Sequence, residues 1–197
     1  MTATAELGLR ERKKAATRQA LSEAALRLAI EHGAERLTVE AIADEVGVSR
    51  RTFSNYFASK EEALLYNDTQ RMRALVDIVR GRPADESPWT ALTVAAAEFY
   101  SGIGELDPAW VAQGRLVRSQ PALVAAQVQA FAAFERELAT EIAARRSEDS
   151  PVRARLTAAT FLAAMRVSLQ IWTEQAAGRP LGELIEESLA EAGRGFQ

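Results

Sequence analysis

Cysteine is absent from this chain of 197 residues, and histidine occurs only once, as His32. Without cysteine the protein can form neither a disulfide nor a thiolate metal site, and one histidine cannot build a multi-histidine site. The same scarcity leaves few routes to a Ser-His-Asp type of catalytic site. We therefore expect no metal, no other cofactor and no enzymatic activity, and we interpret His32 as a donor or cation near a helix C-terminus.

Long apolar runs are also missing. The longest uncharged stretch, residues 119–134, contains three glutamines and is shorter than the ~20 apolar residues of a membrane span. The N-terminal residues lack the apolar core of a signal peptide. These absences predict a cytoplasmic protein without a membrane partner.

The excess of charge is small, because the formal net charge is −3. Its distribution is uneven, since residues 1–60 contain ten Lys/Arg against eight Asp/Glu and the remainder is acidic. Charge bears on partners domain by domain. The overall acidity therefore does not exclude DNA as a partner of the first part.

No window shows the sustained alternation of a strand, and Ala, Leu, Glu and Arg dominate, so we predict an all-α fold. Five of the six prolines stand where a helix can begin. The helices that we predict are residues 10–32, 39–46, 50–57, 60–80, 88–101, 108–119, 121–146, 151–177 and 180–193.

A helix-turn-helix pattern lies within the first 60 residues. Thr38 is placed to cap one short helix and Ser49 to cap the next, with a tight turn at Gly47 and Val48 between them. Two short helices joined by a turn that contains glycine are typical of helix-turn-helix DNA-binding proteins.

The second of these helices has two different faces. At ~100° per residue, Phe53 and Phe57 share one face and Arg51 and Asn55 lie on the opposite one. The arginine can bridge the O6 and N7 acceptors of guanine, and asparagine can pair with adenine. The flanking residues of the polar face are Arg50, Ser54, Thr52 and Tyr56. A polar face is often only solvated, but its place in this motif favours DNA.

Basic residues flank this motif on both sides. Lys60 starts the helix that follows and is placed to meet a phosphate together with the exposed N–H groups there. A basic run precedes the first helix and is placed to reach a flanking backbone or minor groove. This run comprises Arg10, Arg12, Lys13 and Lys14.

The stretch LTVEAIADEVGVSRRTFSNYFASKEEAL, residues 37–64, resembles the N-terminal DNA-binding domain of the TetR family of bacterial transcriptional regulators. The resemblance extends from about residue 10 to residue 65. It implies a helix-turn-helix domain over residues 1–60 and a larger helical ligand-binding and dimerisation domain over residues 61–197. It also implies a ligand-responsive repressor that binds a palindromic operator as a homodimer and is released by a small hydrophobic effector.

By matched position, the resemblance assigns phosphates to Thr38, Thr52, Tyr56 and Lys60, and bases to Arg50, Arg51 and Asn55. The sequence departs from the family twice, since Arg51 stands where Gly or Pro is frequent and Ser54 where an aromatic residue is frequent. The operator sequence therefore does not transfer. The full set of expected DNA-binding residues is Arg12, Lys13, Lys14, Thr38, Ser49, Arg50, Arg51, Thr52, Ser54, Asn55, Tyr56 and Lys60.

The last two predicted helices carry apolar stripes at helical spacing. Family analogy implies that they pair with their symmetry mates as a four-helix bundle, while an intramolecular core is the alternative. The expected interface residues are Leu162, Met165, Leu169, Trp172, Leu184, Ile185 and Leu189.

A ligand pocket, if present, is expected among the fourth to eighth helices, with a hydrophobic or acyl-type occupant. Ordinary core packing is the alternative for the same aromatic residues. The expected ligand-binding residues are Tyr66, Phe99, Trp110, Gln113, Arg115, Arg118, Phe131, Phe134 and Met165, with Leu75 and Leu116 as further apolar walls. The alternative function is a non-enzymatic small-molecule binding or scaffold protein whose helix-turn-helix no longer binds DNA.

Overall fold

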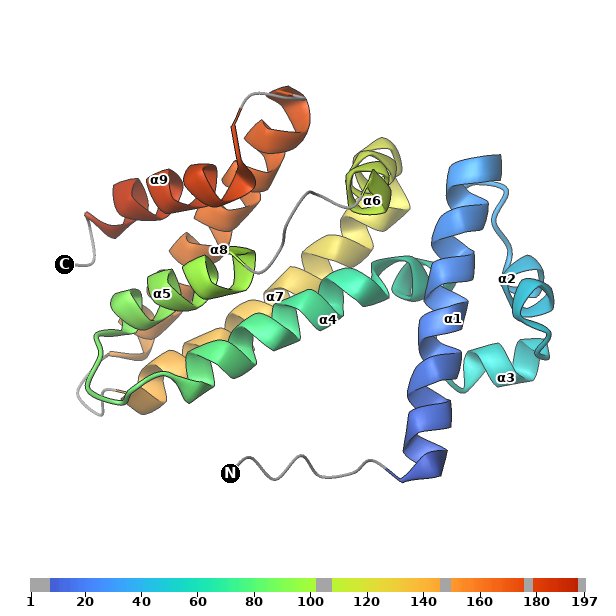
Figure 1. Ribbon diagram of the computed structural model, residues 1–197, viewed down its shortest axis with the longest axis horizontal. Coiled ribbons are helices and arrows are strands. Elements are labelled where there is room, and N and C mark those ends of the chain that lie inside the picture. Colours follow the sequence, from blue (N-terminus) through green and yellow to red (C-terminus); the bar gives the residue numbers. More distant parts are fainter. Residues whose placement is uncertain (1–7, 102–107, 146–149, 176–178, 195–197) are drawn as a thin grey trace. The chain divides into compact units, whose positions relative to one another are not determined.

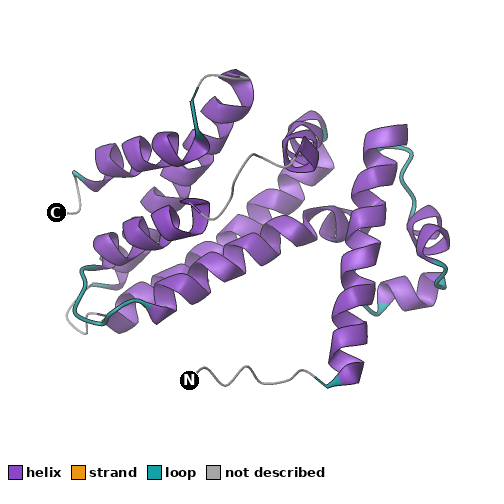
Figure 2. Ribbon diagram, in the orientation of Figure 1, coloured by secondary structure: helices purple, strands orange, loops and turns teal. Residues whose placement is uncertain are grey.

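The computed structural model of the protein describes residues 8–101, 108–145, 150–175 and 179–194. Every regular element within these ranges is an α-helix, which confirms the predicted fold class (Figure 2). The helices are α1 Leu9–His32, α2 Val39–Val46, α3 Arg50–Ser54, α4 Lys60–Gly81, α5 Pro88–Ser101, α6 Pro108–Ser119, α7 Pro121–Arg145, α8 Pro151–Gln175 and α9 Leu181–Gly193.

Most predicted helix boundaries agree with the structure within a residue or two. The clearest difference is α3, which ends at Ser54 although the spacing predicts helix to residue 57. Asn55 is the C-cap, and the N–H of Tyr56 donates to the carbonyl oxygen of Phe53 at 2.8 Å, which tightens the last turn. The predicted ends of two other helices, at residues 146 and 177, lie outside the described residues.

The contacts divide the chain into two compact units. The N-terminal unit runs to Asp68 and includes Leu116–Ala126, and the C-terminal unit consists of Thr69–Arg115 and Gln127–Gln197. The N-terminal unit thus extends into the first turns of α4, beyond the boundary at residue 60 that the sequence suggests.

In the N-terminal unit, α2 and α3 lie on the same side of α1 (Figure 1). The buried stripe of α1 includes Leu21, Ala24 and Ala25, none of them more than 1% exposed. Ile42 and Ala43 of α2 are buried as well. These small and branched side chains allow the three helices to approach closely.

In the C-terminal unit, one apolar core joins α4, α5, α7, α8 and α9. The hydroxyl of Ser168 on α8 donates to the carbonyl oxygens of Ala164 and Leu184 at 2.9 and 3.1 Å and connects α8 with α9. At the end of α9, a Cβ on Gly193 would lie 2.2 Å from Nε1 of Trp89. Glycine is therefore needed there for the close approach of α5 to α9.

Hydrogen bonds from side chains stabilise the C-terminal end of α4. Arg145 of α7 donates to the carbonyl oxygen of Val79 in the last turn of α4 and to that of Pro83 in the turn that follows the helix. The hydrogen bond from Arg82 lowers the pKa of Glu86 below its ordinary value. This end of α4 is thus held by side chains of the C-terminal unit.

Candidate nucleic-acid interface

The turn between α2 and α3 is built by caps that the sequence encodes. Thr38 Oγ1 accepts a hydrogen bond from the N–H of Ala41 at 3.1 Å and starts α2. Gly47 ends it with a φ of 73°, and the N–H of Val48 donates to the carbonyl oxygen of Ala43 at 2.9 Å. This is a Schellman C-cap, in which glycine avoids the strain of a left-handed conformation.

Ser49 begins α3 and fixes its first turn. Its Oγ accepts from the N–H of Thr52 at 3.0 Å and lies 2.9 Å from the hydroxyl of the same residue. Phe53 and Phe57 are 1% and 2% exposed, with ring centroids 5.7 Å apart. The buried phenylalanines therefore anchor one side of α3 within the N-terminal unit.

The other side of α3 is exposed. Arg51 and Asn55 are exposed, as the helical spacing predicts. Arg50 and Ser54 are also exposed, and Nη1 of Arg50 lies 3.1 Å from Oε1 of Glu40 on α2. This surface presents guanidinium, amide and hydroxyl groups, while Thr52 and Tyr56 at its border are half-buried. That these groups meet bases and phosphates remains a prediction.

The basic run near the N-terminus lies within the first helix, as the predicted range of residues 10–32 implies, and does not precede it as a separate arm. Helix α1 begins at Leu9, so Arg12, Lys13 and Lys14 lie in its first turns, where they are exposed. Helical backbone cannot enter a minor groove as an extended arm. These residues can still reach phosphates from the side of a helix.

Lys60 has a structural role that the sequence did not reveal. Its Nζ donates to the carbonyl oxygens of Ala34 at 3.1 Å and Leu37 at 2.8 Å, both in the connection between α1 and α2. An ammonium group has three donors, so one is left for a phosphate. The predicted phosphate contact is therefore limited to a single hydrogen bond in this conformation.

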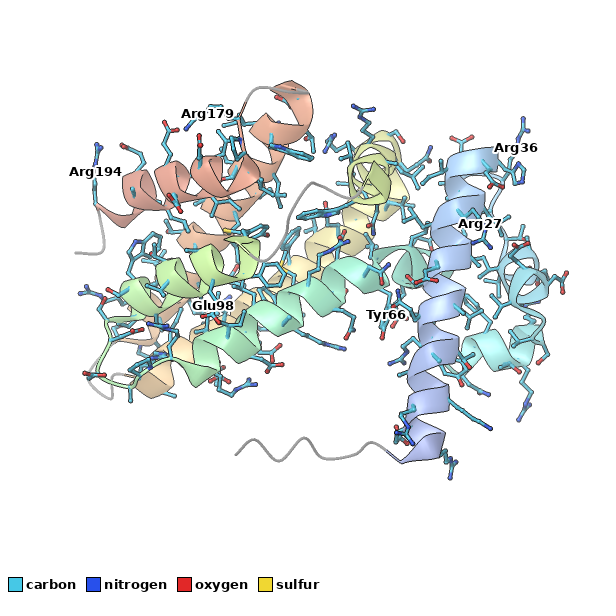
Figure 3. The ribbon with its side chains drawn as sticks, in the orientation of Figure 1. Arg27, Arg36, Tyr66, Glu98, Arg179 and Arg194 are labelled. Carbon is cyan, nitrogen blue, oxygen red and sulfur yellow. The ribbon has the colours of Figure 1, made fainter. Side chains whose placement is uncertain are left out.

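Two arginines of α1 that sequence reasoning missed support the motif. Arg27 lies between α1 and α2 (Figure 3), where its Nη2 contacts Oε1 of Glu45 at 2.6 Å. Nη2 of Arg18 donates to the carbonyl oxygen of Tyr56 at 2.9 Å. Neither contact had a signal in the sequence, because both partners become neighbours only through the tertiary fold.

The predicted ligand-binding residues do not form one group. Tyr66 belongs to the N-terminal unit, where its ring lies edge-on to Phe57 at 5.5 Å (Figure 3 labels its position beside α1). Its contact with a ligand stays a prediction. Leu116 and Arg118 also belong to the N-terminal unit, and Arg118 is exposed.

Most of the other predicted ligand-binding residues lie in the C-terminal unit. Phe134, Met165 and Leu75 are buried in its core, Phe131 is half-buried, and Arg115 is exposed. Gln113 is 1% exposed, which places an amide in the interior.

Phe99 and Trp110 are half-buried and form part of an aromatic cluster that we define as Phe99, Tyr100, Trp110 and Arg71. Phe99 and Tyr100 are T-shaped at 5.0 Å, and Tyr100 and Trp110 are stacked at 6.4 Å. The guanidinium of Arg71 on α4 lies 4.5 Å from the Trp110 ring centroid, a cation–π geometry. Tyr100 and Arg71 were missed by the sequence analysis.

Most residues of the predicted dimer interface are buried within a single chain, which fits the alternative of an intramolecular core. Five of them are 1–7% exposed and belong to the core of a single chain: Leu162, Met165, Leu184, Ile185 and Leu189. Leu169 and Trp172 are half-buried and pack against the same core.

A different stripe of α8 is exposed and apolar. Val152 is 65% exposed, Leu156 57% and Val167 40%, and Ala163 between them is exposed as well. These four residues, which we name the α8 outer stripe, recur at helical spacing along one side of the helix.

The described residues contain neither a metal-binding cluster nor a membrane-spanning helix. No three His, Asp or Glu side chains gather in a way that would hold a metal ion there. In the same part of the chain, every helix is too short or too polar to cross a membrane.

Comparisons with known proteins agree with the helix-turn-helix geometry. Residues 21–66 match the family model described as bacterial regulatory proteins, tetR family, and residues 86–197 match the MftR C-terminal domain. The HTH-type transcriptional regulator TcmR of Streptomyces glaucescens is 37% identical over 173 residues, which cover 84% of this chain and 76% of TcmR.

Solved structures share the fold. The TetR-family repressor FadR of Thermus thermophilus, in complex with lauroyl-CoA, aligns with a TM-score of 0.60 and 25% identity over 91% of this chain and 95% of FadR. The SmeT–triclosan complex aligns with a TM-score of 0.62 and 17% identity over 91% of each chain. The chain therefore belongs to the tetR family of bacterial regulatory proteins and is a DNA-binding transcriptional regulator.

Proposed function

We propose that this regulator is a repressor that binds a palindromic operator as a homodimer and is released by a small-molecule effector. The observation that carries the proposal is the exposed side of α3, where Arg51 and Asn55 stand opposite two buried phenylalanines. A helix held from behind in this way fits the major groove with its polar side toward the base edges.

The polar residues of α3 and of the two positions after it divide by chemistry. Arg51 and Asn55 have the donor and acceptor patterns for guanine and adenine. The hydroxyls of Ser54 and Tyr56, together with the exposed cations of α1, suit phosphates, which position the protein without selecting sequence. Thr38, Ser49 and Thr52 already serve as helix caps or cap partners, so we assign them phosphate contacts only through their remaining donors.

The α8 outer stripe supports a two-fold dimer. Exposed large apolar side chains at successive turns of one helix are costly in water and mark contact surfaces. A two-fold axis brings the same stripe of a second chain against the first, so one patch is sufficient. Such a dimer presents two recognition helices to half-sites about one DNA turn (~34 Å) apart.

The aromatic cluster supports an effector site in the C-terminal unit. Its rings offer apolar faces, and Arg71 brings a cation from α4, which also contributes residues to the N-terminal unit. FadR of Thermus thermophilus binds lauroyl-CoA, and an acyl-type effector is therefore our first candidate. Repression and release require only binding, and we infer a cytoplasmic protein that catalyses no reaction.

Footprinting of the purified protein on its own upstream region tests the proposal. We expect two protected half-sites with centres about 34 Å apart and a complex that contains two chains. Loss of protection on Arg51→Ala would tie the footprint to α3. A wild-type protein that protects no duplex at low salt would instead favour a binding or scaffold protein with an inactive helix-turn-helix.

The effector arm is tested by thermal unfolding with lauroyl-CoA and a panel of aromatic acids. A molecule that binds only the folded state raises the apparent stability in proportion to RT ln(1 + [L]/Kd). We expect one class to raise the unfolding temperature and to release DNA, and Trp110→Ala to weaken both effects. If a ligand stabilises Trp110→Ala as strongly as wild type, its binding site does not include the aromatic cluster.

A further inference from the structure

Arg18 of α1 reaches residues that follow α3 and residues of α4. Its Nη2 donates to the carbonyl oxygen of Tyr56 at 2.9 Å. Its guanidinium carbon lies 5.6 Å from the Phe57 ring centroid and 5.8 Å from that of Tyr66. One side chain thus contacts the end of the recognition helix and the start of α4, all within the N-terminal unit.

The acceptor of this hydrogen bond lies just beyond the C-terminal end of α3, because Asn55 is the C-cap and Tyr56 follows it. Carbonyl groups at a helix C-terminus lack partners within the helix and favour a cation nearby. Helix α3 has five residues, too few to be stable alone. Its direction therefore depends on its supports, which are the buried Phe53, the cap at Ser49 and the contact of Arg18 just beyond its end.

Arg18 is half-buried, and its guanidinium contacts other residues of the unit. Its Nε is buried and has no hydrogen-bond partner in the part of the chain that the structure describes. A buried donor without a partner costs free energy, so this part of the side chain is withdrawn from solvent at a cost. Arg12, Lys13 and Lys14 on the same helix are exposed and differ from Arg18 in this respect.

We propose that Arg18 is a positioning residue for DNA recognition. Its guanidinium fixes the end of α3 between α1 and α4 and so orients Arg51 and Asn55, and it makes no contact with DNA itself. This inference rests on the proposed function, in which α3 reads the bases. It goes beyond that function because it assigns specificity to a residue outside the helix-turn-helix.

Arg18→Met tests the proposal, with Lys14→Met as the matched control. Both variants lose one positive charge from α1, but only the first loses the contacts with Tyr56, Phe57 and Tyr66. For Arg18→Met we expect about tenfold weaker operator binding, the scale of one charged hydrogen bond, with unchanged affinity for non-specific duplex. The salt dependence of non-specific binding should keep the wild-type slope.

Lys14→Met should behave in the opposite way, with similar losses on operator and non-specific duplex. Arg18→Lys keeps a donor for the carbonyl oxygen of Tyr56 but not the planar group over two rings, so it should recover part of the specificity. Amide exchange of the free protein adds a readout that needs no DNA. We expect faster exchange at residues 55–57 in Arg18→Met than in Lys14→Met, with α8 unchanged.

Three results would overturn the inference. These are wild-type specificity in Arg18→Met, an equal loss on both duplexes, or a salt slope reduced by about one, which indicates a direct phosphate contact. Failure of the proposed function can be told apart from failure of this inference, because the wild-type protein would then bind no duplex. In that case unchanged exchange at residues 55–57 in Arg18→Met would still reject the anchoring role of Arg18.

Discussion

Helices α3 and α8 each bury one side and expose another, and the exposed sides differ in chemistry. The outward side of α3 carries Arg51 and Asn55, which keep hydrogen-bonding groups in water. The outward side of α8 carries Val152 and Leu156, which are more than half exposed. Side chains with donors suit a hydrated, anionic surface, whereas aliphatic side chains gain from a dry one. The chemistry of the two surfaces therefore fits the proposal of DNA at α3 and of a second chain at α8.

The two helices also differ in what holds them. Helix α3 has five residues and depends on caps and two phenylalanines, while α8 has 25 residues and packs along a large core. A small local change can reorient α3, but α8 is fixed by many contacts. Function at α3 should thus be sensitive to its supports, and function at α8 to its own surface.

The strongest test of the comparison is Leu156→Asp on the α8 outer stripe. In a two-fold dimer this change buries two unpaired carboxylates, each of which costs several kcal/mol. We expect the dimer dissociation constant to rise by about a thousandfold or more, and operator binding to fall with it. Analytical ultracentrifugation over a range of concentrations measures the first effect.

Ala74→Asp on α4 is the matched control for this variant. Ala74 is exposed, and its substitution adds the same charge outside the α8 outer stripe. It should leave the dimer intact. If Leu156→Asp remains dimeric, the α8 outer stripe is not the dimer interface.

Ile185→Ala on α9 tests whether a residue of the core affects folding stability rather than dimerisation. Ile185 is 1% exposed within a single chain, so truncation leaves a cavity in the core. We expect a loss of about 2–5 kcal/mol in the free energy of unfolding. Denaturant unfolding at fixed protein concentration measures it, and the dissociation constant of the folded dimer should stay close to that of wild type. A dissociation constant that rises as much as in Leu156→Asp would return Ile185 to the interface.

The interface residues show why the sequence did not predict α8 fully. At ~100° per residue, Leu162 and Met165 fall on one side of the helix and Val152 and Leu156 on another, so α8 has two apolar stripes. The spacing alone cannot tell which stripe meets the chain's own core. Larger side chains favoured Leu162 and Met165 for the dimer, although the core of a single chain also selects large side chains.

In α3, by contrast, the sequence predicted both faces, because only one side is apolar. Caps such as Thr38 and Ser49 are local signals, since donor and acceptor lie three residues apart. The contacts of Arg18 with Tyr56 and of Lys60 with Ala34 join residues distant in sequence. No local pattern encodes them, and the same holds for the place of Tyr66.

Arg51→Ala and Asn55→Ala break the α3 side of the comparison directly. Each should cost about 1–3 kcal/mol of operator binding and relax the preference at one base pair, because a base contact is lost. Binding titrations on operators with single base changes measure both effects. Ser54→Ala is the control, since an exposed hydroxyl directed to a phosphate should matter little for base preference. An equal loss of affinity for every DNA sequence would show that Arg51 and Asn55 contact phosphates and not bases.

Glu40→Gln gives the smallest expected effect and concerns the one acidic group that contacts the outward side of α3 among the described residues. Glu40 pairs with Arg50 at 3.1 Å, and both side chains are more than half exposed. Exposed pairs contribute at most about 1 kcal/mol, so the release of Arg50 should tighten DNA binding by no more than about fivefold. In this variant the carboxylate no longer neutralises Arg50, so its positive charge is available to the DNA. The dependence of binding on salt concentration should therefore become steeper. Asp44→Asn removes an equal charge from an exposed position of α2 but leaves the pair of Glu40 and Arg50 intact, and it should change the slope less. Identical titrations for the two variants would show that Glu40 acts only through net charge and that Arg50 is not held back from DNA.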